Sequence, residues 1–174
     1  GMKEFKTSAY VADVLKQLGY EVETQVGGAT GVVAVCDSGK PGPVLGLRAD
    51  MDALGTKDGG AAHLCGHDGH MAMLLAAAEE IMKEKLVRKG KLKLLFQPAE
   101  ESYGGALRMM NEGLFETCPV DAIFGMHVFP DEEVGKIGFY SGPLTTSVDL
   151  YDVTVKGKGG HGSTPHLTKD PILA

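Results

Sequence analysis

Metal-binding types of side chain gather in the stretch HLCGHDGHMAM, residues 63–73. It contains His63, Cys65, His67 and His70, and so holds half of the six histidines of the chain. Imidazole and thiolate groups are preferred ligands of zinc and similar transition ions. Three interpretations are open at this point: a self-contained metal knuckle, a cysteine nucleophile with a neighbouring base, and one part of a larger metal site.

The spacing within this stretch disfavours the first two interpretations. Structural zinc sites close four ligands, usually as two separated pairs, and a single run of eight residues rarely surrounds an ion. His67 and His70 are three apart and can share one face of a helix. A nucleophilic Cys65 would need a base and a third, orienting group, and the excess of metal-type donors would stay unexplained. Further ligands are therefore expected elsewhere in the chain.

Such groups follow other predicted strands. Glu100 and Glu101 come shortly after KLKLLFQ, and His127 lies near the end of AIFGMHV. Neighbouring carboxylates can divide two tasks, because one can bind a metal while the other takes a proton from water. Taken alone, the glutamates could be an exposed helix start and His127 a hydrogen-bonded core residue. Strand ends converge in an α/β sheet, and this favours a shared site.

Two other groups of polar residues allow two interpretations each. Asp50 and Asp52 end a further strand, where one of them could orient a ligand histidine or both could cap a turn. His161 and His166 lie in the glycine-rich segment VKGKGGHGSTPH, which matches neither common phosphate-binding loop. Their spacing is compatible with contact to a substrate and equally with a plain surface position.

The pattern of apolar residues predicts the elements that position these groups. Helical periodicity covers residues 4–18, 69–86 and 104–115, and short β-rich runs occur at 20–26, 31–35, 43–50, 91–97, 120–128 and 134–140. Strands that alternate with helices indicate an α/β class with a layered sheet. A new strand and a glycine-rich loop follow, which predicts two domains, 1–145 and 146–174. Both ends of the chain are typical of a piece cut from a longer protein.

Composition limits the class of function. The 174 residues are 43% hydrophobic and 23% charged, which is typical of a globular protein. A net charge of −6 argues against a nucleic-acid partner. No apolar run has the length of a membrane span, and no signal peptide is recognisable, so no membrane partner is expected. Three widely spaced cysteines without a CxxC pair predict a reducing, cytoplasmic setting.

Five ordered motifs together carry a family resemblance. They are LRADMDAL, HLCGHDGHMAMLL, LLFQPAEE with a following GGA, DAIFGMHVFP and VTVKGKGGHGSTPH with a following DPI. They resemble the metal-dependent amidohydrolases that include hippurate hydrolases, aminoacylase-like N-acyl-amino-acid amidohydrolases and auxin-conjugate hydrolases. The resemblance covers essentially the whole chain. It implies an α/β/α layered, zinc-exopeptidase-like catalytic domain, followed by the start of a smaller α+β lid domain that mediates dimerisation.

The resemblance also implies roles for individual residues. Cys65, His67, Glu101 and His127 would bind two divalent ions, zinc or manganese. Glu100 would be the general base that activates a water between them, and His161 of the lid would bind substrate. Asp52, Asp68 and His70 are expected to orient the ligand residues and to stabilise the start of the helix without binding the metal themselves.

The expected reaction is hydrolysis of the amide of an N-acyl amino acid by metal-activated water, in a homodimer formed through the lid. A metal-dependent exopeptidase acting on short peptides and a non-catalytic binding remnant are the alternatives. Members of the family are about twice as long, and their remainder supplies most of the lid and one more histidine ligand. Gly55–Asp58 and Ser102–Tyr103 depart from the family pattern beside the pocket, where substrate choice is made.

Overall fold

The computed structural model describes residues 1–28, 30–101, 104–147 and 149–173. The chain forms two compact units, Gly1–Glu132 and Glu133–Ala174, which are considered separately. Over its described residues, the first unit contains a five-stranded sheet, three helices and a small hairpin. Within the described residues, no helix combines the length and the apolar character that a membrane crossing requires.

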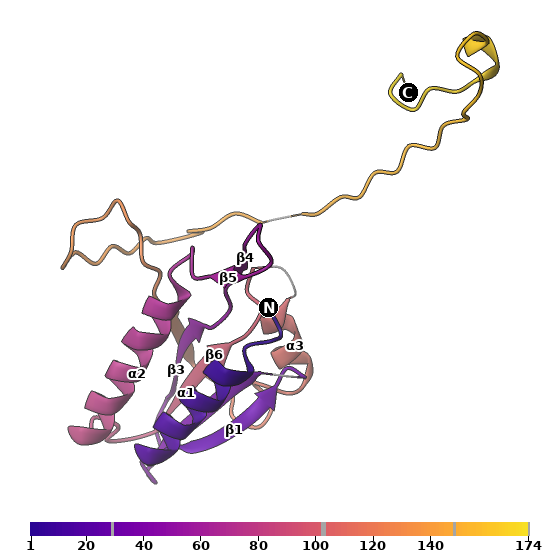
Figure 1. Ribbon diagram of the computed structural model, residues 1–174. Helices are drawn as coiled ribbons and strands as arrows, with labels where there is room; N and C mark the ends of the chain where they lie inside the picture. Colours follow the sequence, from indigo (N-terminus) through magenta and orange to yellow (C-terminus); the bar gives the residue numbers. More distant parts are fainter. Residues whose placement is uncertain (29, 102–103, 148, 174) are drawn as a thin grey trace. The chain divides into compact units, whose positions relative to one another are not determined.

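The sheet of the first unit is mixed (Figure 1). Across the sheet the strands follow the order β1 (Glu21–Val26), β2 (Gly31–Asp37), β6 (Lys91–Gln97), β3 (Val44–Asp50) and β7 (Ala122–Gly125). β2 runs antiparallel to both of its neighbours, whereas β6, β3 and β7 are mutually parallel. The carboxyl ends of these three parallel strands therefore lie at one edge of the sheet, as the sequence predicts for an α/β protein.

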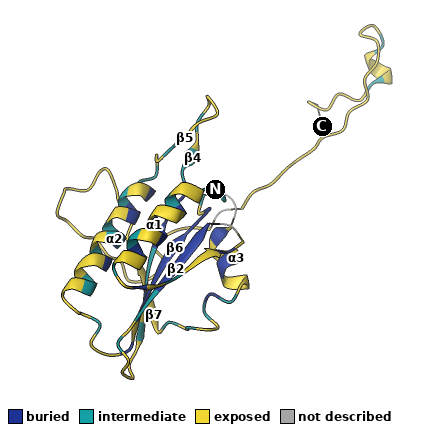
Figure 2. Cartoon of the chain, turned by 60° about the horizontal axis from the view of Figure 1, so that its bottom comes forward, coloured by how far each residue is buried: buried dark blue, intermediate teal, exposed yellow. Residues whose placement is uncertain are grey.

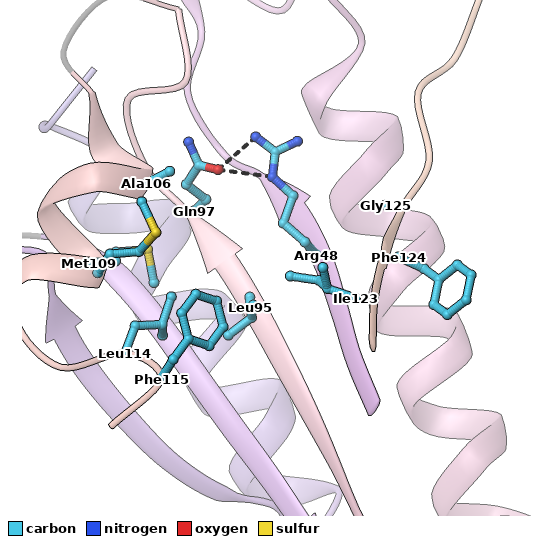
Figure 3. A pocket seen from close by; sticks show the side chains of 11 residues that line it. Arg48, Leu95, Gln97, Ala106, Met109, Leu114, Phe115, Ile123, Phe124 and Gly125 are labelled. Atoms are coloured by element: carbon cyan, nitrogen blue, oxygen red, sulfur yellow. Dashed lines mark hydrogen bonds between the residues drawn. The ribbon is translucent and has the colours of Figure 1, made fainter. Parts of the chain in front are cut away.

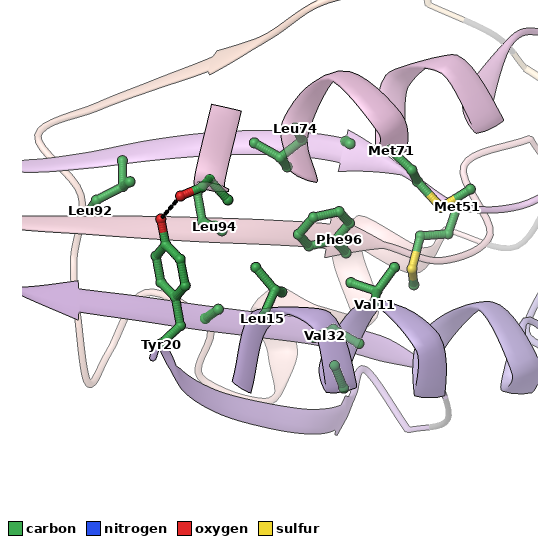
Figure 4. Packing of buried hydrophobic residues seen from close by; sticks show 14 residues of the cluster. Val11, Leu15, Tyr20, Val32, Met51, Met71, Leu74, Leu92, Leu94 and Phe96 are labelled. Carbon is green, nitrogen blue, oxygen red and sulfur yellow. Dashed lines mark hydrogen bonds between the residues drawn. The ribbon is translucent and has the colours of Figure 1, made fainter. Parts of the chain in front are cut away.

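Two helices, α1 (Phe5–Gln17) and α2 (His67–Lys83), pack on one face of the sheet (Figure 4). Val11 and Leu15 of α1 are one helical turn apart and are 1% and 0% exposed. They meet Leu94 and Phe96 of β6, both fully buried, together with Leu74 of α2. The helical spacing in the sequence thus becomes an apolar stripe that covers alternate residues of the strands.

The opposite face carries α3 (Gly105–Asn111) and a second, smaller core. Leu95 of β6 points to this side and packs with Met109 and Leu114. Lys93 is also buried here, and its ammonium donates hydrogen bonds to the carbonyl oxygens of Leu114 and Cys118. Burial lowers the pKa of Lys93. Helices on both faces make the three-layered α/β/α arrangement that the family resemblance implies, with the buried faces visible in Figure 2.

Two segments differ from the sequence-based expectation. The predicted strand at 134–140 is wrong, because these residues form turns and irregular backbone. The new strand predicted after residue 145 is wrong as well, because residues 149–157 have no strand assignment. The described residues of the second unit contain one isolated bridge, Lys158↔Lys169, and a 3₁₀ turn, η1 (Pro165–Leu167). A β-rich pattern makes a strand only where a second strand supplies hydrogen-bond partners. A small hairpin of β4 (Leu54–Gly55) and β5 (Ala61–Ala62) follows Asp52 in the first unit.

Tyr20 provides a test of the main core. Its hydroxyl donates a 3.0 Å hydrogen bond to the carbonyl of Ala78 in α2. Burial, reinforced by Cys36, raises the pKa of Tyr20 from 10.0 to about 12. We expect Tyr20→Phe to lower the free energy of unfolding by about 1 kcal/mol in urea titrations at neutral pH. Exposed Tyr10→Phe is the matched control, and equal losses in both variants would contradict the assignment.

The same hydroxyl gives a pH dependence with a defined sign. Because the folded-state pKa of Tyr20 lies above the unfolded value, the folded protein holds the phenolic proton more tightly. The stabilising contribution is complete below pH 10 and is lost as the pH rises toward 12. Over this interval the wild type should lose more stability than Tyr20→Phe, as measured by the urea midpoint.

Candidate metal centre

His67 lies at the centre of the site, at the first residue of α2. Its side chain is 1% exposed, and Nδ1 lies 3.2 Å from Oδ1 of Asp52. A carboxylate can only accept, so Nδ1 carries the proton and Nε2 keeps its lone pair. This Nε2 faces carboxylate oxygens of Asp50, Glu100 and Glu101 at 3.7, 3.9 and 3.7 Å.

The two glutamates project from the loop that follows β6. Ala99 immediately before them is fully buried and has a φ of 49°, a left-handed conformation that costs a non-glycine residue about 1–3 kcal/mol. The amide of Glu101 donates to Oδ2 of Asp52 at 3.1 Å, so one aspartate holds both His67 and this loop. The Glu100 side chain is 41% exposed and that of Glu101 22%, an asymmetry that suits one solvent-facing and one inward-facing carboxylate.

Cys65 and His127 meet beside this group. The thiol sulfur lies 3.4 Å from Nε2 of His127, although the residues are 62 positions apart. Nδ1 of His127 donates to the carbonyl of Val128 at 2.7 Å, and a carbonyl can only accept. Nε2 of His127 is therefore the nitrogen that keeps a lone pair, and it points at the sulfur.

The charge around Cys65 is strongly negative. Burial raises the pKa of the thiol, and Glu101, Glu100 and Asp50 add to the effect, so that the value reaches about 11. A cation is the group that would reverse this effect, because it favours the thiolate and neutralises the carboxylates.

The donor atoms fit a cation. Nε2 of His67 and Oε1 of Glu101 are buried without a hydrogen-bond partner among the described residues, 3.7 Å apart. Such orphaned buried atoms are rare unless an ion or water satisfies them. Two zinc ligands at a tetrahedral angle lie about 3.3–3.6 Å apart, close to both this spacing and the Cys65–His127 distance. Cys65, His67 and His127 form one possible ligand group, and His67, Glu100 and Glu101 another.

Asp50, a buried acidic residue at the end of β3, lies beside the proposed metal ligands and is held by hydrogen bonds. Arg48 donates to Oδ2 of Asp50 at 2.8 Å, and its other nitrogens donate to Oε1 of Gln97 at 2.9 and 2.7 Å (Figure 3). Burial acts to raise the pKa of Asp50, but the hydrogen bond from His70 and the positive charge of Arg48 act against it, and the pKa is lowered. Asp50 is therefore a charged group at the floor of the site.

The predicted site residues fall into three groups. The structure brings together Cys65, His67, Glu100, Glu101, His127, Asp52 and His70. Asp68 lies exposed in the first turn of α2, where a negative charge suits the helix dipole. His161 lies in the second unit, where Nδ1 is 2.8 Å from the Ser163 hydroxyl, and His63 is exposed. Ser102 and Tyr103 lie outside the described residues.

Sequence reasoning missed Arg48 and Gln97. The sequence pattern that could have indicated Arg48 is a positively charged residue within the otherwise apolar strand LGLRAD, two residues before the acidic Asp50. Both side chains also border an open, mainly apolar cavity of about 330 Å³ on the α3 side of the sheet, with Met109 and Phe124 (Figure 3). The described residues that line this cavity include no candidate metal ligand, so the cavity is separate from the centre.

Comparison with known proteins gives consistent results. The profile of peptidase family M20/M25/M40 matches residues 46–174. The chain is 43% identical to thermostable carboxypeptidase 1 of Saccharolobus solfataricus, over 98% of this chain and 46% of that protein. It is also 43% identical to the hippurate hydrolase of Campylobacter jejuni, over 100% of this chain and 47% of that protein. The chain thus spans about half the length of these relatives.

A solved structure from Bacillus subtilis is similar as well. It is described as a dinuclear metal-binding peptidase of the M20 family, and it superimposes with a TM-score of 0.75 at 35% sequence identity. The superposition covers 83% of this chain and 42% of that one.

Replacing Cys65 tests the ligand set without any substrate. We expect cobalt(II) added to the protein to give a near-ultraviolet sulfur-to-metal absorption band, because thiolate is a soft ligand. Cys65→Ser should abolish the band and weaken zinc binding in calorimetric titration, whereas the half-buried Cys36→Ser should leave both unchanged. A band of full intensity in Cys65→Ser would place the thiolate ligand elsewhere.

Proposed function

Because the chain belongs to peptidase family M20/M25/M40, a family of metal-dependent hydrolases, we propose that the protein cleaves the amide bond of N-acyl amino acids. The observation that carries the proposal is a pair of buried atoms, Nε2 of His67 and Oε1 of Glu101, that have no hydrogen-bond partner within the described part of the chain, with Glu100 beside them. The similarity to a hippurate hydrolase favours an acyl amino acid as substrate.

The residues that would hold the metal follow from the geometry. Cys65, His67, Glu101 and His127 offer a mixed set of donors, in which sulfur and nitrogen favour zinc and carboxylate oxygen also suits manganese. Two bound divalent ions would acidify a water and stabilise negative charge on the carbonyl oxygen of the substrate. We propose two ions rather than one because the similar Bacillus subtilis structure is described as a dinuclear metal-binding peptidase.

Glu100 is the proposed general base. Its Oε2 lies 3.9 Å from Nε2 of His67, so it borders the ligands, yet its side chain is 41% exposed and can reach water. In this proposal Glu100 takes the proton of the water that attacks the scissile carbonyl. It then returns that proton to the nitrogen of the leaving amino acid as the amide bond breaks. Glu101, less exposed, stays a ligand.

The remaining parts of the proposal concern the whole protein. Residues 1–145 would form the first part of the catalytic domain, and residues 146–174 would begin a lid that mediates homodimerisation. His161 of that lid would bind the substrate and polarise its carbonyl. A cytoplasmic location is proposed from the cysteines, all three of which are free thiols.

An exopeptidase acting on short peptides is a second candidate. The similarity to a carboxypeptidase is the observation that favours it, since the identity of 43% equals that to the hippurate hydrolase. The two reactions break the same kind of bond and would use the same metal centre. They differ in what the pocket accepts beyond the scissile amide.

Replacing Glu100 tests the mechanism. We expect Glu100→Gln to lower kcat by about 100- to 10,000-fold, because the amide cannot accept the proton of water. The metal content of the variant, measured by inductively coupled plasma mass spectrometry, should equal that of the wild type. Glu79→Gln, an exposed position on α2, makes the same chemical change away from the site and should keep full activity. Unchanged turnover in Glu100→Gln would remove Glu100 from the role of base.

A substrate panel separates the two candidate reactions. We expect kcat/KM for N-benzoyl and N-acetyl amino acids to exceed that for dipeptides with the same C-terminal residue. The reverse order would make the protein an exopeptidase. If zinc- or manganese-loaded protein hydrolyses neither class, a binding role without catalysis is the remaining interpretation.

A further inference from the structure

His70 has the features of a fifth metal ligand. Its side chain is 1% exposed, and Nδ1 lies 2.7 Å from Oδ1 of Asp50, much as Nδ1 of His67 faces Asp52. Donor atoms of Asp50, His67 and His70 lie within 4.8 Å of one another. On composition and spacing alone, this trio is as good a metal group as the others.

The second ring nitrogen of His70 has a different partner. The backbone amide of Val128 donates to Nε2 at 3.0 Å. An amide can only donate, so Nε2 uses its lone pair in this bond, and the proton of the neutral ring lies on Nδ1. Nδ1–H then donates to Asp50. Both nitrogens are thus engaged by the protein outside the ligand group. Among the described residues, Nε2 of His67 has no hydrogen-bond partner, and Nε2 of His127 faces the thiol of Cys65, itself a proposed ligand.

The amide that His70 binds belongs to the residue directly after a proposed ligand. His127 comes two residues after β7, a four-residue strand whose residues are all exposed and which pairs with β3 at the sheet edge. Nothing in the strand itself fixes the His127 ring. The carbonyl of Val128 accepts from Nδ1 of His127, so Val128 is tied to both histidines.

Packing adds a second attachment for Val128. Gly66, with a φ of +81°, precedes α2, and a Cβ built there would lie 2.2 Å from Cγ2 of Val128. No side chain larger than hydrogen fits at Gly66 while Val128 keeps this position. The valine therefore lies directly on the start of the helix that carries His67 and His70.

We propose that His70 is a positioning residue that fixes His127 in the ligand group, by linking the Val128 amide to the buried Asp50. The inference rests on the proposed metal centre and deepens it. Arg48 holds Asp50 from the other side, and Gln97 of β6 holds Arg48. A hydrogen-bonded chain thus runs from β6 through β3 and α2 to the segment after β7.

Paired substitutions of His70 provide the test. His70→Leu removes both hydrogen bonds, whereas His70→Gln keeps one amide donor and one amide acceptor. We expect zinc affinity, measured with a competing chelator, to fall by about 10- to 100-fold in His70→Leu, as for other groups that orient metal ligands. Much of the affinity should return in His70→Gln. His63→Leu, an exposed histidine of the same stretch, is the matched control and should bind like the wild type.

A measurement on the metal-free protein tests the linkage independently. Amide hydrogen exchange at Val128, followed by NMR on the full chain, should accelerate by about tenfold or more in His70→Leu but not in His63→Leu. A loss of affinity caused by general unfolding would accelerate core amides such as that of Phe96 as well. Protection at Phe96 that matches the wild type confirms a local effect.

The possible outcomes separate the inference from the proposed function. Wild-type affinity and normal Val128 exchange in His70→Leu would overturn the positioning role while leaving the metal centre intact. Loss of one bound ion in both His70→Leu and His70→Gln would make His70 a ligand, which also overturns it. A wild-type protein that binds no zinc, cobalt or manganese would remove the proposed function and the inference together.

Discussion

Two buried carboxylates at the end of β3 constrain the rest of the structure. Asp50 and Asp52 are each 1% exposed, and a buried charge is tolerated only when other groups pair with it. Asp50 is paired with Arg48 and His70, and Asp52 with His67 and the amide of Glu101. Because both histidines start α2, pairing the acids also fixes where that helix begins and which of its faces meets the sheet.

The strand order then decides which segments share the edge with these acids. β6, β3 and β7 are parallel neighbours, so the loops after Gln97 and Gly125 emerge beside Asp50. One loop delivers Glu100 and Glu101, and the other delivers His127 to Cys65. Hydrophobic burial on both faces of the sheet holds these loops in place. The polar edge itself contributes little stability, because its described residues include buried atoms without a hydrogen-bond partner and Ala99 in a left-handed conformation. Strain and unsatisfied polar atoms concentrated in one place are typical of a functional site.

Prediction from sequence succeeded where one local pattern determines the outcome. The apolar period of α1, the β-rich run of β6 and the helical pattern over 69–86 for α2 each place an element within a few residues of its observed bounds. It failed at residues 134–140, because strand formation depends on a partner strand, and that information is not local. Arg48 was missed for a similar reason: its role is visible only once Asp50 and Gln97 lie beside it in the sheet.

The amino-acid sequence by itself determined which metal-binding side chains are present, their order along the chain and the family of metal-dependent hydrolases. These properties depend only on residue type and on the order of the motifs. Residue type and spacing alone could not rank the histidines of HLCGHDGH, since all have the same ring and similar spacing, and the ligand role of His67 and the supporting role of His70 came from the family resemblance. Tertiary structure distinguished them by what meets each nitrogen. Among the residues that the structure describes, Nε2 of His67 has no hydrogen-bond partner, whereas Nε2 of His70 accepts a hydrogen bond from the amide of Val128, 58 positions away. A hydrogen bond between such distant segments exists only after the sheet has brought them together.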